Sequence, residues 1–450
     1  MQISTVTFRS TLFVCALPFI GASALADEER LPWGAIKAGN ADGSIPAYTG
    51  GLPTSTNPPG FKADSGYWAD PYAQDKPLYT ITSSNVDQYA DKLSESTVAL
   101  LKRFPSYSVP VYQTRRSASY PDWIVENMKL NAAGRCKTIE NGEALEGCFG
   151  GKPFPVPKNG YEAMWNLLTH YRGYSVWTRG EGWYVDSAGN KVMTAGVVNR
   201  YQSNYYDKKS NLEEFQANGG YYLLQNNVYN APVRNAGEGN LQRKSVNPIA
   251  NADKTWTYSP GQRRVRLAPD TAYDFPIATS GGASLYDEIY MFSGNMDRFD
   301  FKLVGTREMI IPYNAYRWAA TPPQELLQKN HPNPEVMRWE LHRVWVVEAT
   351  LKPGQRHVVS KKRFYLDEDI PGAGIYEGWD ASGKLSRASW APPYQAYDKQ
   401  VPFVTSYWIY EFNTGVYYHS SISTKGNHID VDQVDTAFYT PEGLARRTQR

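Results

Sequence analysis

Acidic and histidine side chains are the first groups in this sequence whose types and spacing suggest chemistry. The run Asp367-Glu368-Asp369 ends a β-rich segment just before Pro371-Gly372. Carboxylate oxygens suit Ca²⁺, but a calcium loop spaces its ligands along the chain, so this run predicts a solvated turn. His342 and His357 lie on the two arms of one predicted hairpin. They fit a metal pair or, more simply, two ordinary sheet residues, and we predict no metal site.

Carboxylates and short motifs are the features of the sequence that could support catalysis. Asp297, Asp300 and Glu308 are candidate carboxylates for glycoside hydrolysis, which needs two such groups about 5–10 Å apart across a sugar. The chain has no H-E-x-x-H, no G-x-S-x-G and no Walker-type phosphate loop. The segment 372–378 has one residue too many for the dinucleotide motif G-x-G-x-x-G. We therefore predict no catalytic residue and no cofactor, with a glycan-active enzyme as a minor alternative.

Aromatic side chains carry more information. The chain has 33 Tyr, 13 Trp and 16 Phe, and in several β-rich runs they recur at alternate positions, on one face of a strand. A curved sheet lined in this way encloses an apolar cavity, the usual form of a small-molecule site. A packed core or an amphipathic rim is the alternative. The predicted cavity-lining residues are Tyr174, Trp183, Trp256, Tyr258, Trp345, Trp408 and Tyr410.

The elements that would position these residues follow from turn signals and apolar periodicity. After residue 172, pairs of β-rich runs flank short turn sequences, which is typical of hairpins, and consecutive hairpins predict one large, curved antiparallel sheet. Apolar residues at three- and four-residue steps predict helices before it. The fold class is therefore α+β, with helices covering one face of the sheet. The predicted hairpins span residues 174–206, 252–268, 339–367, 374–390 and 404–424, and the predicted helices span 85–104, 121–130, 160–171 and 322–329.

Export is predicted from the first 26 residues. A short apolar stretch, Thr11 to Ile20, precedes Ala24-Leu25-Ala26, so residues 1–26 resemble a signal peptide cleaved after Ala26. The stretch is shorter than the roughly 20 residues of a membrane span, and no later run is long enough. Cys136 and Cys148 remain after cleavage, and an even pair in an exported protein predicts a disulfide.

Composition also bears on domains and partners. Residues 27–84 are rich in Gly, Pro, Ser and Thr and predict an extended N-terminal arm that packs on the body through spaced aromatic residues. Residues 85–450 are predicted to form a single domain. Lys plus Arg is 47 against 45 for Asp plus Glu, and this balance argues against a nucleic-acid partner.

Four sequence blocks are similar to the domain-of-unknown-function family 1329. The blocks run over residues 34–52, 256–269, 292–314 and 342–369. The resemblance implies a periplasmic protein with the half-open antiparallel barrel of the lipoprotein carriers, which hold acyl chains under a helical lid. It implies no catalytic residue. Because members are commonly encoded beside a porin-like outer-membrane protein, it also raises an outer-membrane β-barrel as a partner.

The resulting hypothesis is a periplasmic, non-catalytic carrier or chaperone for a lipid, lipoprotein or other hydrophobic molecule, linked to outer-membrane sorting or transport. The helices of residues 85–171 would form its lid. The alternatives are an accessory protein that docks on an outer-membrane β-barrel and, less favoured, the glycan-active enzyme.

Overall fold

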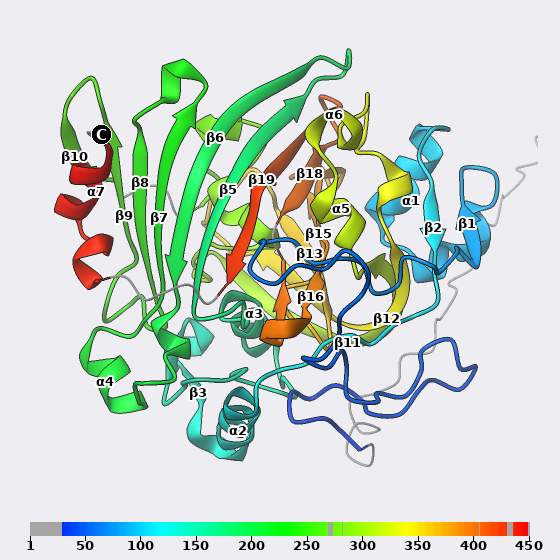
Figure 1. Ribbon diagram of the computed structural model, residues 1–450, viewed down its shortest axis with the longest axis horizontal. Coiled ribbons are helices and arrows are strands. Elements are labelled where there is room, and N and C mark those ends of the chain that lie inside the picture. Colours follow the sequence, from blue (N-terminus) through cyan, green and yellow to red (C-terminus); the bar gives the residue numbers. More distant parts are fainter. Residues whose placement is uncertain (1–28, 269–272, 281, 405, 430–434, 449–450) are drawn as a thin grey trace, which may run out of the picture.

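A large, curved, mainly antiparallel sheet organises the protein (Figure 1). The computed structural model describes residues 29–268, 273–280, 282–404, 406–429 and 435–448, so the predicted signal peptide lies outside the described residues. The strand order of the fifteen-stranded sheet is β1-β2-β12-β13-β14-β15-β18-β19-β5-β6-β7-β8-β9-β10, with β11 beside β12. Its strands are β1 Tyr79–Ile81, β2 Val109–Val111, β5 Ser175–Val185, β6 Lys191–Gln202, β7 Tyr221–Ala231, β8 Gly239–Ser245, β9 Lys254–Ser259, β10 Arg264–Leu267, β11 Phe299–Pro312, β12 Trp339–Leu351, β13 Lys361–Asp367, β14 Gly374–Trp379, β15 Leu385–Ala391, β18 Tyr407–Glu411 and β19 Val416–Ile429.

The fold class predicted from the hairpin signals is confirmed. The pairs β5–β6, β9–β10, β12–β13, β14–β15 and β18–β19 are all antiparallel neighbours, as expected for short turns between consecutive strands. The sheet is not closed, because β1 and β10 end the described strand order without pairing to each other. Two small hairpins lie outside it: β3 Lys137–Ile139 with β4 Ala144–Glu146, and β16 Tyr394–Ala396 with β17 Val401–Phe403.

The helices lie at several places along the sheet (Figure 1). The predicted helix 85–104 is divided into a 3-10 helix, Val86–Lys92, and α1, because Ser94 is extended and accepts a hydrogen bond from the Thr97 N–H at 3.2 Å as an N-cap. The predicted helices 121–130 and 160–171 correspond to α2 and α3. The helices are α1 Glu95–Arg103, α2 Asp122–Leu130, α3 Gly160–Leu168, α4 Leu212–Ala217, α5 Tyr316–Ala320, α6 Pro323–Leu326 and α7 Pro441–Thr448.

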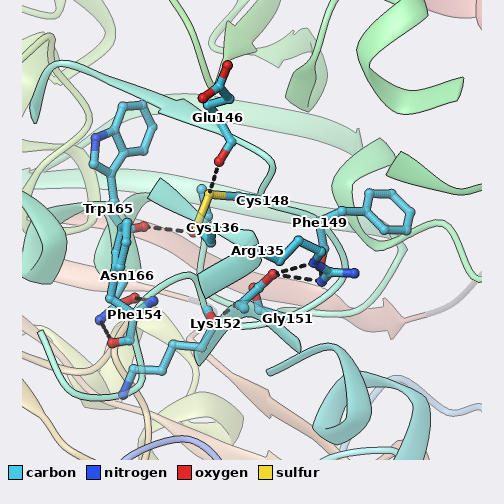
Figure 2. The surroundings of a disulfide bond; sticks show 12 residues. Arg135, Cys136, Glu146, Cys148, Phe149, Gly151, Lys152, Phe154, Trp165 and Asn166 are labelled. Atoms are coloured by element: carbon cyan, nitrogen blue, oxygen red, sulfur yellow. Dashed lines mark hydrogen bonds between the residues drawn. A yellow bond between two sulfur atoms is a disulfide. The ribbon is translucent and has the colours of Figure 1, made fainter. Parts of the chain in front are cut away.

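A disulfide closes a loop that α3 contacts. Cys136 and Cys148 are bonded with their Cα atoms 4.3 Å apart, which confirms the predicted pair (Figure 2). The Trp165 Nε1 donates to the Gly142 carbonyl of the turn within the disulfide loop at 2.8 Å. Asn166 exchanges two hydrogen bonds with the backbone of Phe154, at 2.7 and 2.9 Å (Figure 2). Trp165 therefore ties α3 to the cross-linked loop, and Asn166 ties it to the segment that follows this loop.

Residues 29–78 cross the body without regular strands or helices, apart from an isolated bridge between Arg30 and Ile36. Trp33 and Ile45 are buried in the main core. Gly34 has φ +88°, and a Cβ there would lie 1.8 Å from the Pro155 carbonyl oxygen. Only glycine allows this close backbone approach, which seats the start of the arm against the loop before α3.

Candidate ligand-binding cavity

A cavity of about 180 Å³ lies on the inner face of β5–β8. The end of α3, a roof segment (residues 286–293) and residues of β18 and β19 enclose its other sides. Ligand pockets for drug-sized molecules commonly have volumes of about 300–1,000 Å³. The space therefore suits one small or thin molecule rather than a bulky lipid.

The floor of the cavity is a chain of side-chain amides across three strands. Asn199 of β6, Asn227 of β7 and Asn240 of β8 are directly opposite one another in the register. Asn199 donates to Asn227, Asn227 donates to Asn240 at 2.9 Å, and Asn240 donates to the Tyr229 hydroxyl at 2.9 Å. Because these amides bond mainly to one another, the floor is polar but most of its hydrogen-bonding groups already have partners.

The walls and roof are apolar and aromatic. Leu167 and Leu168 come from the last turn of α3, and Ile289 comes from the roof segment. Tyrosines supply rings with polar tips, which suits a ligand that is apolar over most of its length. The tyrosines in the lining are Tyr201, Tyr222, Tyr229, Tyr286, Tyr290, Tyr407 and Tyr418.

The roof segment is held by buried ion pairs. Asp287 pairs with Lys362, and it lies 3.0 Å from His357 Nε2. Burial alone raises the pKa of Asp287, but the neighbouring Lys362 and His357 hold it well below its usual range. Close to Asp287 in the sequence, Tyr290 and Met291 have φ angles of 49° and 75°. Consecutive bulky residues in this region are strained, and such strain is concentrated at functional sites.

None of the seven aromatic residues predicted to line a cavity contributes to this one. Trp256 and Tyr258 of β9 do not face the cavity; they belong to a second, smaller core with Leu444 of α7. Figure 1 shows α7 on the outer side of β8–β10. Tyr174 precedes β5 and donates to Asp207 at 3.3 Å, and Trp183 is half-buried and donates to Glu181 at 2.9 Å.

The other three predicted residues are in the main core. Trp345 is 3% exposed within β12, which is buried along most of its length. Trp408 stacks on Trp390 with ring centroids 4.1 Å apart, and Tyr410 lies edge-on to Phe104 at the end of α1. Side chains of β18 do alternate between two faces, as predicted. Trp408 and Tyr410 are on the face toward α1, whereas Tyr407 is on the face toward the cavity.

The predicted solvated turn at Asp367-Glu368-Asp369 is wrong. All three side chains are buried, between 0 and 2% exposed. His342 lies 3.5 Å from Asp367, and arginines surround Glu368 and Asp369. The Arg116 guanidinium lies 2.9 Å from Asp369 and 3.5 Å from Glu368, and Arg343 lies 3.4 Å from Glu368. We call this group the arm cluster; it comprises Arg116, Lys152, Arg343, Glu368 and Asp369.

The arm cluster binds the backbone and side chains of the N-terminal arm. Trp33 Nε1 donates to Asp369 at 3.0 Å, and the Ile36 N–H donates to Glu368 at 3.2 Å. Lys152 Nζ donates to the Trp33 carbonyl at 2.8 Å. These charge-assisted bonds replace part of the hydration that the buried ions lose. The cluster therefore attaches the arm to the sheet, and it lies apart from the cavity.

This burial makes stability depend on pH in a defined direction. Burial raises the pKa of Asp367 to about 7 and that of Glu368 to about 7. Between about pH 4 and 7 these two carboxyls keep protons in the folded protein that the unfolded chain releases, so their contribution to the free energy of unfolding falls as pH rises across this window. His342 is also buried, but Glu340 and Asp367 raise its pKa, which adds a loss of the same sign. His170, His331 and His419 act in the opposite direction, because burial lowers their pKa, so the contribution of Asp367 is measured as a difference between two proteins.

Asp367→Asn removes one of these titrating carboxyls, so the free energy of unfolding of the variant relative to the wild type should rise by up to about 1.4 kcal/mol per pH unit within this window. Urea titrations of both proteins at pH 5, 6, 7 and 8 measure the effect. Asp91→Asn, at an exposed position, is the matched control and should leave the profile unchanged. An Asp367→Asn profile that runs parallel to the wild-type profile from pH 5 to 7 contradicts the prediction.

The remaining candidate residues are distributed over separate contacts, and Asp297 accepts a hydrogen bond from the Tyr273 hydroxyl at 2.7 Å. Within the described ranges, no group of three His, Cys, Asp or Glu side chains is placed to hold a metal ion. His342 bonds with Glu340, at 3.0 Å, whereas His357 bonds with Asp287 in a separate network. Asp300 and Glu308 are eight residues apart on β11, a separation of about 26 Å, far beyond the 5–10 Å of a glycosidase pair.

Comparison with known proteins places the chain in a family. A family model described as "Protein of unknown function (DUF1329)" matches residues 80–445. An uncharacterized protein of Pseudomonas aeruginosa is 41% identical over 400 residues, covering 86% of this chain and 84% of that protein. The part of the chain that the structure describes has no helix long and apolar enough to cross a membrane.

Two solved structures also show similarity. A DUF1329 family protein from Desulfovibrio piger is 12% identical, with 60% of this chain and 92% of that one covered and a TM-score of 0.41. A putative outer membrane lipoprotein-sorting protein domain from Vibrio parahaemolyticus is 14% identical, with coverage of 61% and 92% and a TM-score of 0.42. From the family match and the Pseudomonas relative, we conclude that this chain belongs to the DUF1329 family.

Proposed function

We propose that this protein is a periplasmic, non-catalytic carrier that holds one small hydrophobic molecule in the cavity between β5–β8, α3 and the roof segment. The observation that carries the proposal is the cavity itself, which has apolar walls, tyrosine rings and a self-satisfied amide floor. Burial of a ligand methylene contributes about 0.8 kcal/mol, so a chain of several methylenes supplies useful affinity without catalytic groups.

The sequence-based lid is revised in this proposal. Of the helices of residues 85–171, only α3 supplies lining residues. The roof segment would form most of the lid. It contains Asp287, which is paired with Lys362, and Tyr290 and Met291, whose φ angles are positive. Exchange of the ligand would then involve movement of the roof segment away from β18 and β19.

Filling the cavity should abolish binding. Val197 lines the cavity, and its neighbour Val198 projects from the other face of β6. We expect Val197→Trp to reduce uptake of a fluorescent fatty-acid probe at least tenfold, because the indole occupies the space that the ligand needs. Val198→Trp adds the same bulk outside the cavity and should bind the probe normally. Equal binding by the two variants would contradict the proposal.

The native protein provides an independent test. The full chain is expressed in a Gram-negative host, recovered from the periplasm and examined by native mass spectrometry. We expect a polypeptide that begins at Asp27 and carries a small apolar adduct. A protein that has no adduct, takes up no probe and is recovered with an outer-membrane β-barrel instead would favour the accessory-protein alternative.

A further inference from the structure

We propose that the cavity selects a ligand with an anionic oxygen head group, a carboxylate or a phosphate, and that Arg172 binds this group. The inference rests on the proposed carrier function and defines the chemical class of its ligand. Arg172 follows α3 and lines the cavity at the end where Tyr201 and Tyr290 also lie.

The Arg172 guanidinium is positioned by aromatic rings rather than by an acid. Its central carbon lies 5.6 Å from the Tyr201 ring centroid and 5.9 Å from that of Tyr290. These rings hold a cation through their faces but leave its N–H groups free to donate in the ring plane of the guanidinium. Among the ion pairs of the described residues, none involves Arg172.

The contact with His170 does not satisfy Arg172. Arg172 Nη2 lies 3.3 Å from His170 Nδ1, but that nitrogen is also 2.6 Å from the Leu167 carbonyl oxygen. A carbonyl oxygen only accepts, so Nδ1 must carry the hydrogen in the shorter bond and cannot accept from the guanidinium. Burial holds the pKa of His170 well below its usual range, so the ring is neutral and adds no competing charge.

The charge of Arg172 is therefore unbalanced within the cavity. Among the residues that the structure describes, the lining contains no Asp or Glu. Its other strong cation, Lys244, is paired with Asp253 at 3.1 Å and donates to the Ser293 carbonyl at 2.9 Å. A half-buried cation without an acid loses hydration that nothing replaces, and an anionic oxygen ligand restores it through two parallel N–H···O bonds.

The rest of the lining suits the tail of such a ligand. Along β6 the inward residues run from Tyr201 through Asn199 and Val197 to Ala195. Six residues of strand span about 20 Å, so a head group at Arg172 leaves room for an extended chain along the floor. Because the floor amides bond to each other, they demand no polar partner from that chain.

Ten-carbon probes separate the head group from the tail. Titration calorimetry on the delipidated full-length protein compares decanoate, decyl phosphate, decanol and decyltrimethylammonium. We expect the better of the two anions to bind at least tenfold more tightly than decanol, and the cation to bind more weakly. The ranking of decanoate against decyl phosphate distinguishes a carboxylate from a phosphate ligand.

Variants assign the preference to Arg172. Arg172→Gln should lower anion affinity to the level of decanol, and a urea unfolding transition like that of the wild type shows that the variant is folded. Arg172→Lys keeps the charge without the two-pronged geometry and should be intermediate. Arg200→Gln, on the other face of β6 near Phe438, is the matched control and should keep the anion preference.

The outcomes separate the two proposals. Equal affinity for decanoate, decyl phosphate and decanol, or an unchanged preference in Arg172→Gln, overturns this inference while the carrier function stands. If none of the four probes binds, the carrier function fails and the inference fails with it.

Discussion

Replacing Arg116 with methionine is expected to lower the free energy of unfolding by about 3–5 kcal/mol. The Arg116 side chain is 2% exposed, and it pairs with both Asp369 and Glu368. Its Nη1 also donates to the Ile36 carbonyl at 2.8 Å. Removing one member of a buried ion group leaves the remaining charges desolvated and unpaired, which costs far more than loss of a surface pair. Urea denaturation at pH 8 measures the loss.

The same substitution should loosen the N-terminal arm. With the arm cluster broken, limited proteolysis is expected to cut residues 29–78 at lower protease concentration than in the wild type. Lys129→Met is the matched control, because its pair with Glu126 is on the surface, with side chains 54% and 65% exposed. It should change stability by less than about 1 kcal/mol. An Arg116→Met loss as small as the control would show that the arm cluster does not hold the arm.

Replacing Trp408 with alanine is expected to cost about 3–5 kcal/mol of folding stability and to leave ligand affinity unchanged. The indole is 2% exposed and stacks on Trp390, on the α1 side of the sheet rather than the cavity side. Truncation leaves a void in a packed core, where neighbouring groups relax only partly. Thermal and urea unfolding measure the first effect, and probe titration measures the second.

Trp183 provides the comparison for this experiment. It is half-buried, so Trp183→Ala removes less buried surface and should cost less than Trp408→Ala. If Trp408→Ala were fully stable and lost ligand binding instead, the original prediction of Trp408 as a cavity residue would be restored. The two readouts therefore distinguish a core tryptophan from a ligand-contacting one.

Much of the architecture is local in origin and could be predicted. The turn residues between β5 and β6, or between β14 and β15, set hairpins whose strands are adjacent in sequence. The helix at 160–168 follows from apolar periodicity and an Asn159 cap. By contrast, β11 was not predicted, although it pairs with β12 along thirteen positions, because its Phe299–Pro312 sequence lacks a neighbouring turn signal.

The aromatic pattern of the sequence does not identify the residues that line the cavity. The inward positions of β7 and β8 include amides at alternate residues, with Gln225 and Asn227 on one strand and Asn240 and Gln242 on the next. That amide pattern was a usable signal at period two. It was overlooked because amides are usually read as solvent-facing residues.

By itself, the sequence determined the α+β class, the hairpin order, the disulfide and the family, because each depends on neighbouring residues or on a linear motif. Only the tertiary structure decided which face of each strand is inside. Alternation along a strand indicates which residues share a face, but the element that packs on that face decides what the face does. The face with Trp256 and Tyr258 packs against α7, and the face with Trp408 packs on the α1 side of the sheet. The burial of Glu368 and Asp369 was also decided by the tertiary structure, because Arg116 and Lys152, which contact them, lie more than 200 residues earlier in the chain.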